Sequence, residues 1–446
     1  MKTRHRIALA LIASLPFAPL AAADPKPGPR LVVRATYDTG LGANGSEIIS
    51  VRHTDGIAAL TNVAGSVDVL DLSDPLNPRL LRRVQIGTAV GTPNSVAVHP
   101  HHDYFLVAIG RTASTGLVAA YRLSDGAFLD SVAAGIQPDS IAIAPNGQHA
   151  VVANEAEGVA SQGGAPSNNG GAGSLSILDL TGFNGVGPGE LSVTNVALPS
   201  LAGVPGVSTN RTDDLARLAV DNTPGTVEPE SVAFSKNSRF AYVTLQENNA
   251  VVQVDIHTGQ LTVFGLFQTT HLADLTPNAS YQPVETLTAF REPDGIALDQ
   301  TGRFFVTADE GDTRNAAGAA GPRGGRTVSV FDAETGVLLG DTGSQLDDAA
   351  DEAGIYPDDR SNRGATEPEV LDLTHHRGLT LVAVSLERAN AVALIDLSEP
   401  TAPVVIDIES VGTGPEGIKF FRHGRGLFLA VANEVSGTVS ILEVVF

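Results

Sequence analysis

Acidic side chains recur in this sequence at turns that contain proline or glycine. In each repeated unit, the first of these turns comes just before the first short apolar run, and we call it the opening turn. Another turn follows the second apolar run, and we call it the middle turn. The opening turns contribute Glu47, Asn94, Asp139, Glu230, Asp294, Glu369 and Glu416, and the middle turns contribute Asn62, Glu155, Glu247, Glu310, Glu387 and Glu434. Carboxylate and amide oxygens are the ligands that hard cations prefer. This pattern therefore favours Ca²⁺ or Mg²⁺ over zinc.

The densest acidic run is DEGD at residues 309–312, just before a Gly/Ala-rich stretch. We predict Asp309, Glu310 and Asp312 as the first metal ligands, because functional side chains gather in loops on rigid scaffolds. Six further predicted ligands come from other turns: Glu155, Glu230, Asp294, Glu369, Glu416 and Glu434. The alternative is that acids are simply common in exposed turns and that a repeat copies them. No residue is assigned as catalytic.

Three arginines are placed to bind an anion beside such a cation. Arg314 and Arg388 lie on or just after middle turns, and Arg360 lies in a long insertion. A guanidinium group beside a metal would form a phosphate-binding pair. The same arginines would equally serve as counter-charges to the acidic turns.

Histidines and a second group of aspartates occupy the remaining turns. Six histidines fall between the first and second apolar runs of their units, which we expect to open on the opposite face: His99, His101, His102, His375, His376 and His423. We interpret them as solvated turn residues rather than metal ligands. Aspartates end the third runs at Asp71, Asp179, Asp255, Asp332 and Asp396. Their short side chains can bond the backbone two residues on, so we expect them to be structural.

The elements that position these turns form an internal repeat. Seven units begin near residues 45, 93, 138, 228, 292, 367 and 414, and all but the last contain four short runs of alternating apolar residues bounded by turn residues. This is the pattern of strands and hairpins, with almost no helical periodicity. The shortest spacings, such as Glu47 to Asn94, match one four-stranded blade. We predict an all-β, seven-bladed β-propeller with insertions at 158–173, 198–226, 267–290, 312–326 and 345–366.

The last unit has only three runs, which would leave an apolar strand edge bare. The segment 30–37 (RLVVRATY) reads as a strand without a unit of its own. We predict that it supplies the fourth strand of the last blade. Because no linker interrupts the repeats, residues 24–446 are predicted to form a single domain.

Residues 1–23 have the layout of a secretory signal peptide. A basic start (Lys2, Arg4, Arg6) precedes a short apolar run and the small residues Ala21 to Ala23. We therefore expect cleavage after Ala23 and a periplasmic or secreted protein. The later sequence has no run of roughly 20 apolar residues, so no membrane span is expected.

Composition excludes several classes of function. The chain has no cysteine and no tryptophan, which rules out disulfides, thiolate chemistry and WD-type blades. Its 50 acidic residues outnumber 28 basic ones, so its field repels nucleic acids and suits cationic or small-molecule ligands. Motifs for serine hydrolases, zincins, P-loop enzymes and dinucleotide binding are absent.

Several segments resemble the bacterial choice-of-anchor I proteins. They are GSEII (45–49), SVDVLDLSDP (66–75), PDSIAI (138–143), VANE (152–155), TADEGDTR (307–314), RS (360–361) with EPE (367–369), and VANEVSG (431–437). The sequence is also similar to mesenchyme-specific cell-surface glycoproteins and, more widely, to YncE-like and lactonase-like propellers. The resemblance implies an exported seven-bladed propeller, and some members carry the label alkaline phosphatase. The sequence stops on its last strand, which predicts no C-terminal anchor.

Two functions follow as hypotheses. The first is an exported binding or scaffold propeller with divalent cations at the acidic mouth of its channel. The second is a metal-dependent phosphoric-ester hydrolase, in which the metal polarises the phosphoryl oxygen and activates water. A lactonase would rest on analogy of fold alone.

Overall fold

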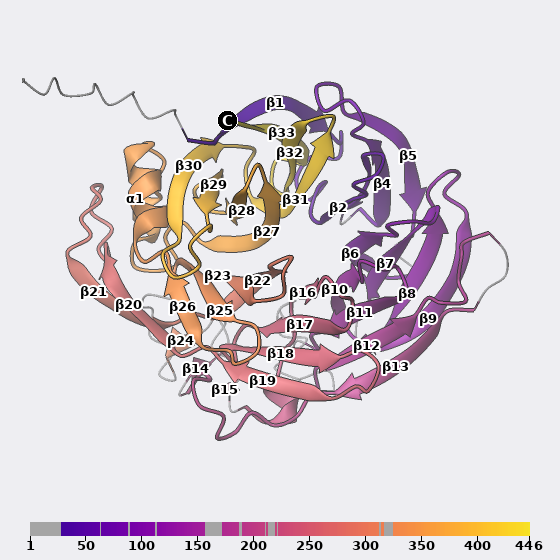
Figure 1. Ribbon diagram of the computed structural model, residues 1–446, viewed down its shortest axis with the longest axis horizontal. Helices are drawn as coiled ribbons and strands as arrows, with labels where there is room; N and C mark the ends of the chain where they lie inside the picture. Colours follow the sequence, from indigo (N-terminus) through magenta and orange to yellow (C-terminus); the bar gives the residue numbers. More distant parts are fainter. Residues whose placement is uncertain are drawn as a thin grey trace, which may run out of the picture.

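The computed structural model of this chain describes residues 28–62, 64–87, 90–111, 114–156, 172–186, 190–209, 211–212, 219–220, 222–311, 314–315 and 324–446. Seven four-stranded antiparallel sheets form a ring around a central channel (Figure 1). The predicted seven-bladed propeller is therefore confirmed. The predicted signal peptide, residues 1–23, lies outside the described residues, as does most of the predicted insertion at 158–173.

The four strands of each blade are arranged in order from the central channel to the outside of the ring. The innermost strands are β2 (Ile49–Val51), β6 (Thr92–Val98), β10 (Pro138–Ile143), β16 (Val232–Phe234), β22 (Pro293–Leu298), β27 (Pro368–His376) and β31 (Pro415–His423). The second strands are β3 (Ile57–Asn62), β7 (Tyr104–Gly110), β11 (His149–Asn154), β17 (Phe240–Leu245), β23 (Phe304–Asp309), β28 (Leu379–Leu386) and β32 (Gly426–Asn433).

The third strands are β4 (Ser66–Asp71), β8 (Thr115–Arg122), β12 (Ser174–Asp179), β18 (Ala250–Asp255), β25 (Thr327–Asp332), β29 (Ala391–Asp396) and β33 (Thr438–Val445). The outermost strands are β5 (Arg79–Gln85), β9 (Phe128–Ile136), β13 (Ser192–Ala197), β19 (Leu261–Gly265), β26 (Leu338–Asp341), β30 (Val404–Ser410) and β1 (Arg30–Asp38). We number the blades 1 to 7, beginning with β2 and ending with β31.

Blade 7 is a composite of the two ends of the chain. Its outermost strand is β1, which pairs antiparallel with β33 from Arg30 opposite Val445 to Asp38 opposite Thr438. This confirms the predicted closure of the ring by the N-terminal strand. The pairing covers the edge of β33 and so removes an exposed template for aggregation.

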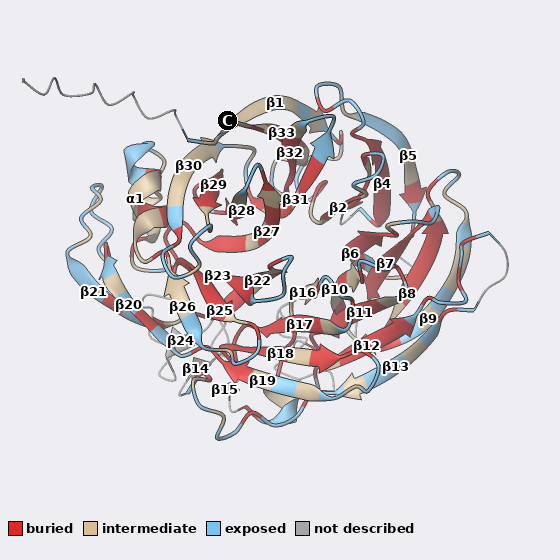
Figure 2. Cartoon of the chain, in the orientation of Figure 1, coloured by how far each residue is buried: buried red, intermediate tan, exposed pale blue. Residues whose placement is uncertain are grey.

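The core is a ring of apolar clusters, one at each interface between neighbouring blades. Successive side chains of a second strand point into two different clusters, since strand side chains alternate between faces. In β11, for example, Val151 packs between blades 3 and 4, and Val152 packs between blades 2 and 3. This two-sided burial explains why the second strands are apolar throughout, whereas the outermost strands are partly exposed (Figure 2).

The insertions contain structure that the strand pattern did not predict. Segment 267–290 is a hairpin of β20 (Gln268–Ala273) and β21 (Glu285–Phe290), and 345–366 contains α1 (Gln345–Glu352) and the 3₁₀ helix η3 (Asp358–Arg360). Segment 198–226 holds β14 (Arg211–Thr212), β15 (Ala219–Val220) and η2 (Pro224–Thr226). Strand β14 also pairs with β24 (Arg314–Asn315), so two insertions from different blades form one small sheet.

Candidate functional site

The opening and middle turns lie on one face of the ring, around one end of the channel. Their carboxyl groups are close enough to repel one another: Glu155, Asp139, Glu247 and Asp294 all act on Glu230. We call this group the acidic mouth. It comprises Glu47, Asp139, Glu155, Glu230, Glu247, Asp294, Glu310, Glu369, Glu387, Glu416 and Glu434. The structure therefore brings together most of the predicted ligands. The acidic mouth as a whole contains carboxylates from every blade except blade 2.

The two amides of the predicted turns have structural partners instead. The Asn94 side chain donates to the carbonyl oxygen of Pro138 at 3.0 Å and so ties blade 2 to blade 3. Asn62 is fully buried and accepts a hydrogen bond from the Ser66 hydroxyl at 2.9 Å. The contact of Asn94 explains the amide in blade 2, because a carboxylate could not donate to Pro138.

In blades 3, 5, 6 and 7 a proline motif holds the opening turn against the middle turn. Before the first proline of a blade, Gln137, Glu292, Glu367 and Gly414 adopt positive φ angles of 48°, 51°, 49° and 65°. In this conformation their carbonyl groups accept hydrogen bonds from middle-turn N–H groups. Examples are Gln137 O from Glu155 N at 3.0 Å and Glu367 O from Glu387 N at 2.9 Å. Non-glycine residues rarely adopt this conformation, so the bond is made at some cost in strain.

Burial and mutual repulsion make the mouth carboxyls weak acids. Burial, followed by the charges of Asp139 and Glu434, raises the pKa of Glu47 to about 8. Burial, followed by the charges of Glu434, Glu387, Asp294 and Glu47, raises the pKa of Glu416 to about 9. Each charge added to the mouth therefore opposes the next.

Two pairs of mouth carboxyls lie close enough for one member to lower the pKa of the other: Glu369 lowers that of Asp294, and Glu416 lowers that of Glu434. A hydrogen bond within such a pair requires a proton between the two oxygens, because two ionised carboxylates offer only acceptors. Burial is the main reason that the pKa of Asp294 nevertheless rises to about 7. Loss of the proton would leave two repelling charges side by side.

The tightest group of potential ligands lies between blades 5 and 6. One carboxylate oxygen from each of Glu310, Glu367 and Glu369 lies within 4.8 Å of the other two. Gln246 donates to the second oxygen of Glu310 at 2.6 Å. Glu310 and Glu369 were predicted ligands, whereas Glu367 was not. Its signal in the sequence is its place before the proline of an opening turn.

The predicted anion-binding arginines have carboxylate partners. Arg388 donates from Nε to Glu367 at 2.5 Å and from Nη1 to Glu387 at 2.5 Å, and Arg360 also pairs with Glu367. Glu367 is therefore charge-compensated on one side while it faces Glu310 and Glu369 on the other. Arg314 lies in β24, and its side chain is outside the described part of the structure.

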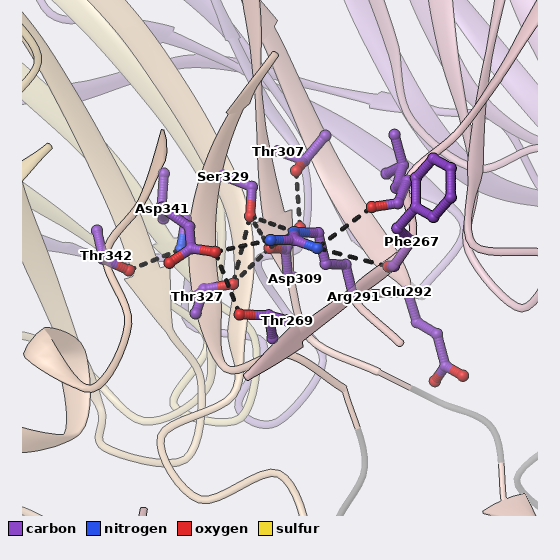
Figure 3. A network of polar contacts seen from close by, with 12 residues as sticks. Phe267, Thr269, Arg291, Glu292, Thr307, Asp309, Thr327, Ser329, Asp341 and Thr342 are labelled. Atoms are coloured by element: carbon purple, nitrogen blue, oxygen red, sulfur yellow. Dashed lines mark hydrogen bonds and ion pairs between the residues drawn. The ribbon is translucent and has the colours of Figure 1, made fainter. Parts of the chain in front are cut away.

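Asp309 and Glu310 are neighbours in sequence but have different environments. The Asp309 carboxylate is fully buried and accepts hydrogen bonds from Thr307 at 2.7 Å, Thr327 at 2.5 Å and Ser329 at 2.5 Å (Figure 3). Arg291 lies 3.8 Å away and pairs with Asp341 at 2.7 Å. These residues form a polar network in blade 5, which Arg291 extends to the carbonyl oxygens of Leu266 at 3.2 Å and Phe267 at 3.5 Å.

This network gives Asp309 a structural role instead of a place among the mouth ligands. Burial raises the pKa of Asp309 to about 6, and Arg291 and the three hydroxyl groups oppose that rise. The structure thus separates the two predicted neighbours: Asp309 ends β23 with its carboxylate enclosed by donors, whereas Glu310 follows the strand and lies near Glu367 and Glu369. The third member of the predicted run, Asp312, lies outside the described residues.

Two histidines of the opposite face link neighbouring blades, and one of them, His99, is buried, which corrects the prediction that it is a solvated turn residue. His99 bonds to the Gly147 carbonyl through Nε2 at 3.0 Å, and its Nδ1 accepts from the backbone N–H groups of His101 and His102. Burial lowers the pKa of His99 to about 4, which keeps the ring neutral. His375 bonds to Asp299 of blade 5 at 2.8 Å.

The aspartates at the ends of the third strands cap their own turns. Asp71 accepts from the Ser73 N–H at 2.9 Å, and Asp179 accepts from the Thr181 N–H at 2.8 Å. Asp255, Asp332 and Asp396 make the equivalent bond to the residue two positions on. Their predicted structural role is confirmed.

The molecule is thus a seven-bladed β-propeller with an acidic channel mouth. Two solved propellers have the same overall fold. Kuenenia stuttgartiensis hydrazine synthase aligns over 90% of this chain and 95% of its own, with 14% identity and a TM-score of 0.53. The β-propeller domain of Myceliophteria thermophila Cps50 (Swd1) aligns over 93% of this chain and 100% of its own, with 11% identity and a TM-score of 0.53. At these identities the likeness concerns the fold alone.

The family is defined by the sequence profile of the choice-of-anchor I domain, which matches residues 47–323 and 317–400. The chain belongs to this family. A search of curated proteins finds no match. Within the described residues, no helix is long and apolar enough to cross a membrane.

Proposed function

We propose that this protein is an extracytoplasmic binding or scaffold propeller whose acidic mouth holds a divalent cation, with Ca²⁺ preferred. The main support is the trio Glu310, Glu367 and Glu369, whose carboxylate oxygens lie within 4.8 Å of one another. Oxygen atoms at such separations can share one hard cation with little rearrangement.

The donor set fits calcium better than magnesium. Ca²⁺ accepts six to eight oxygens in flexible geometry, whereas Mg²⁺ requires near-ideal octahedral geometry at shorter distances. The mouth offers many glutamates from separate turns, among them Glu310, which accepts a hydrogen bond from Gln246 at 2.6 Å. Glu367 would contribute while its other contacts, to Arg360 and Arg388, hold it in place.

A bound cation would act as a clamp between blades. Glu310 follows β23 in blade 5, whereas Glu367 and Glu369 begin blade 6. The ion would relieve repulsion among Glu369, Glu416 and Asp294. A rigid, cation-loaded face of this kind suits binding of a partner or small molecule at the channel mouth.

Location outside the cytoplasm is supported by the family and by the N-terminal sequence. Choice-of-anchor domains occur on exported proteins, and residues 1–23 have the composition of a signal peptide. The exported protein should begin at Asp24. Mass spectrometry of protein from the periplasm or medium tests this, and an intact N-terminus there would contradict it.

The phosphoric-ester hydrolase hypothesis has weaker support. It requires a guanidinium group open to phosphate beside the metal. Arg360 and Arg388 both bind Glu367, and Arg388 also binds Glu387. A phosphate would have to displace these carboxylates. Phosphatase assays before and after chelation test this hypothesis separately from cation binding.

The central experiment compares thermal unfolding with Ca²⁺, Mg²⁺ or a chelator, alongside elemental analysis of the purified protein. Because the ion binds only the folded state, Ca²⁺ at a hundred times its Kd should stabilise the protein by about 2.7 kcal/mol. The double change Glu310→Gln and Glu369→Gln should remove most of this response. Glu334→Gln, in an exposed turn of blade 5, is the matched control. A melting temperature indifferent to both ions and to chelator would overturn the proposal.

A further inference from the structure

The turns between first and second strands surround the opposite end of the channel, and part of this face carries a positive charge. In blades 6 and 7 these turns and their strands contain Arg377, Lys419, Arg422 and Arg425. Beside them lie His53, His376 and His423. We call these seven residues the cationic cluster. Its charge is the reverse of the whole chain's, which has 50 acidic and 28 basic residues.

The arginines of this cluster are held by neutral groups. Arg422 donates from Nη2 to the His375 carbonyl oxygen at 2.6 Å, which places a residue of blade 7 against blade 6. The Arg377 guanidinium carbon lies 4.6 Å from the centre of the Phe446 ring. Within the described part of the chain, Arg377, Arg422 and Arg425 form no ion pair with a carboxylate.

Few carboxylates reach the cluster. Asp372 pairs with Lys419 at 3.5 Å, and its other oxygen accepts from the Phe420 N–H at 2.8 Å. Asp74 lies near His423 at the periphery. Burial lowers the pKa of His376, and Arg422 and Arg377 lower it further. Positive charges therefore repel one another here as negative charges do at the mouth.

We propose that the cationic cluster binds a compact, multivalent anion of the phosphate or pyrophosphate type. Each guanidinium group presents a planar fork of N–H donors that matches phosphate oxygens. The bond from Arg422 to the His375 carbonyl uses one Nη and fixes the direction of the rest. Such a prepositioned side chain loses little freedom on binding.

The surroundings of the cluster favour a compact anion over a planar anionic surface. The turns between third and fourth strands lie on the same face but farther from the channel. They carry exposed acids, Asp74 in blade 1 and Glu399 in blade 6. A flat membrane would meet these acids at the same time as the arginines, whereas a small anion would touch the arginines alone.

The test is calorimetric titration of the mature protein with inorganic pyrophosphate, at low salt and with a chelator present so that the acidic mouth stays free of metal. Binding is expected, and each of Arg422→Gln and Arg425→Gln should weaken it by about tenfold, the usual scale for a hydrogen bond to a charged group. Arg303→Gln removes an exposed arginine from the equivalent turn of blade 5 and should leave the Kd unchanged. Thermal melts establish that each variant is folded.

Three results would overturn the proposal. They are an absence of pyrophosphate binding, an equal loss of affinity in Arg303→Gln, and binding to phosphatidylglycerol vesicles without binding to free pyrophosphate. The last would assign the surface to a membrane. Because the titration contains no divalent cation, failure here leaves the proposed calcium site untouched, and failure of that site leaves this cluster untouched.

Discussion

Asp309 and Glu310 are adjacent carboxylates with opposite surroundings. Asp309 is enclosed by three hydroxyl donors and Arg291, whereas Glu310 faces Glu367 and Glu369 across the channel mouth. Burial raises the pKa of both Asp309 and the mouth residue Glu416, yet only at Glu416 do neighbouring charges add to that effect. The comparison separates carboxylates that the fold has satisfied from those that still attract a cation.

The difference has an energetic meaning. A buried charge surrounded by donors stabilises the fold only as part of its network, and removing one member leaves the others unpaired. A carboxylate surrounded by other carboxylates lowers the stability of the folded state unless a cation or a positively charged side chain is bound nearby. Replacing the carboxylate should therefore change the free energy of unfolding in opposite directions at Asp309 and in the acidic mouth.

The largest effect is expected from Asp309→Ala. Among the described residues, this change leaves Asp341 as the one carboxylate paired with Arg291, and it removes the acceptor of Thr307, Thr327 and Ser329. It should cost about 3 kcal/mol of unfolding free energy. Glu310→Gln, one residue on, should cost little or should stabilise the chelated protein. Urea unfolding of both variants decides this. Equal losses would erase the distinction between the network and the mouth.

A smaller effect is expected from pH. The folded-state pKa values of about 7 for Asp294, 8 for Glu47 and 9 for Glu416 lie above their ordinary values. The folded state therefore holds these protons more tightly than the unfolded state does. The stability that this contributes is fully present below pH 4 and is lost as the pH rises through the folded-state pKa values, from 7 to 9. With chelator, the protein should be about 2 kcal/mol less stable at pH 9 than at pH 6, after allowance for water at the mouth.

The pH range above 7 isolates the mouth, because the pKa of Asp309 is about 6. Glu416→Gln mimics a protonated side chain and should flatten the pH dependence, and Ca²⁺ should restore stability at pH 9. Unfolding curves at the two pH values provide the measurement. A pH profile that is the same in Glu416→Gln and the unsubstituted protein would contradict the assignment.

The smallest effect is expected on the opposite face. His101→Gln together with His102→Gln should change stability by less than about 0.5 kcal/mol, because both side chains are exposed. The response of the melting temperature to Ca²⁺ should also stay the same. A reduced calcium response in this double variant would move the cation site away from the acidic mouth.

The sequence was sufficient to predict the ring, its seven blades and its closing strand, because a repeat displays the same strand pattern many times. It also predicted which turns share a face. It could not separate Asp309 from Glu310, since their partners Arg291, Thr327 and Ser329 come from other strands. Helix α1 was missed because its eight residues lie inside a polar insertion. Glu367 was missed as a ligand because its direction depends on a positive φ.

The pairing of β1 with β33 also bears on how the chain reaches its fold. Arg30 lies opposite Val445, so this ladder joins segments that are far apart in the sequence. Contacts between such distant segments form slowly, and the ring can close only when both segments are available. The same geometry would allow circular permutation, because Arg30 and Val445 lie side by side. A short linker from Phe446 to Arg30, with the chain opened between residues 158 and 173, would make this contact a local hairpin, and refolding should become faster.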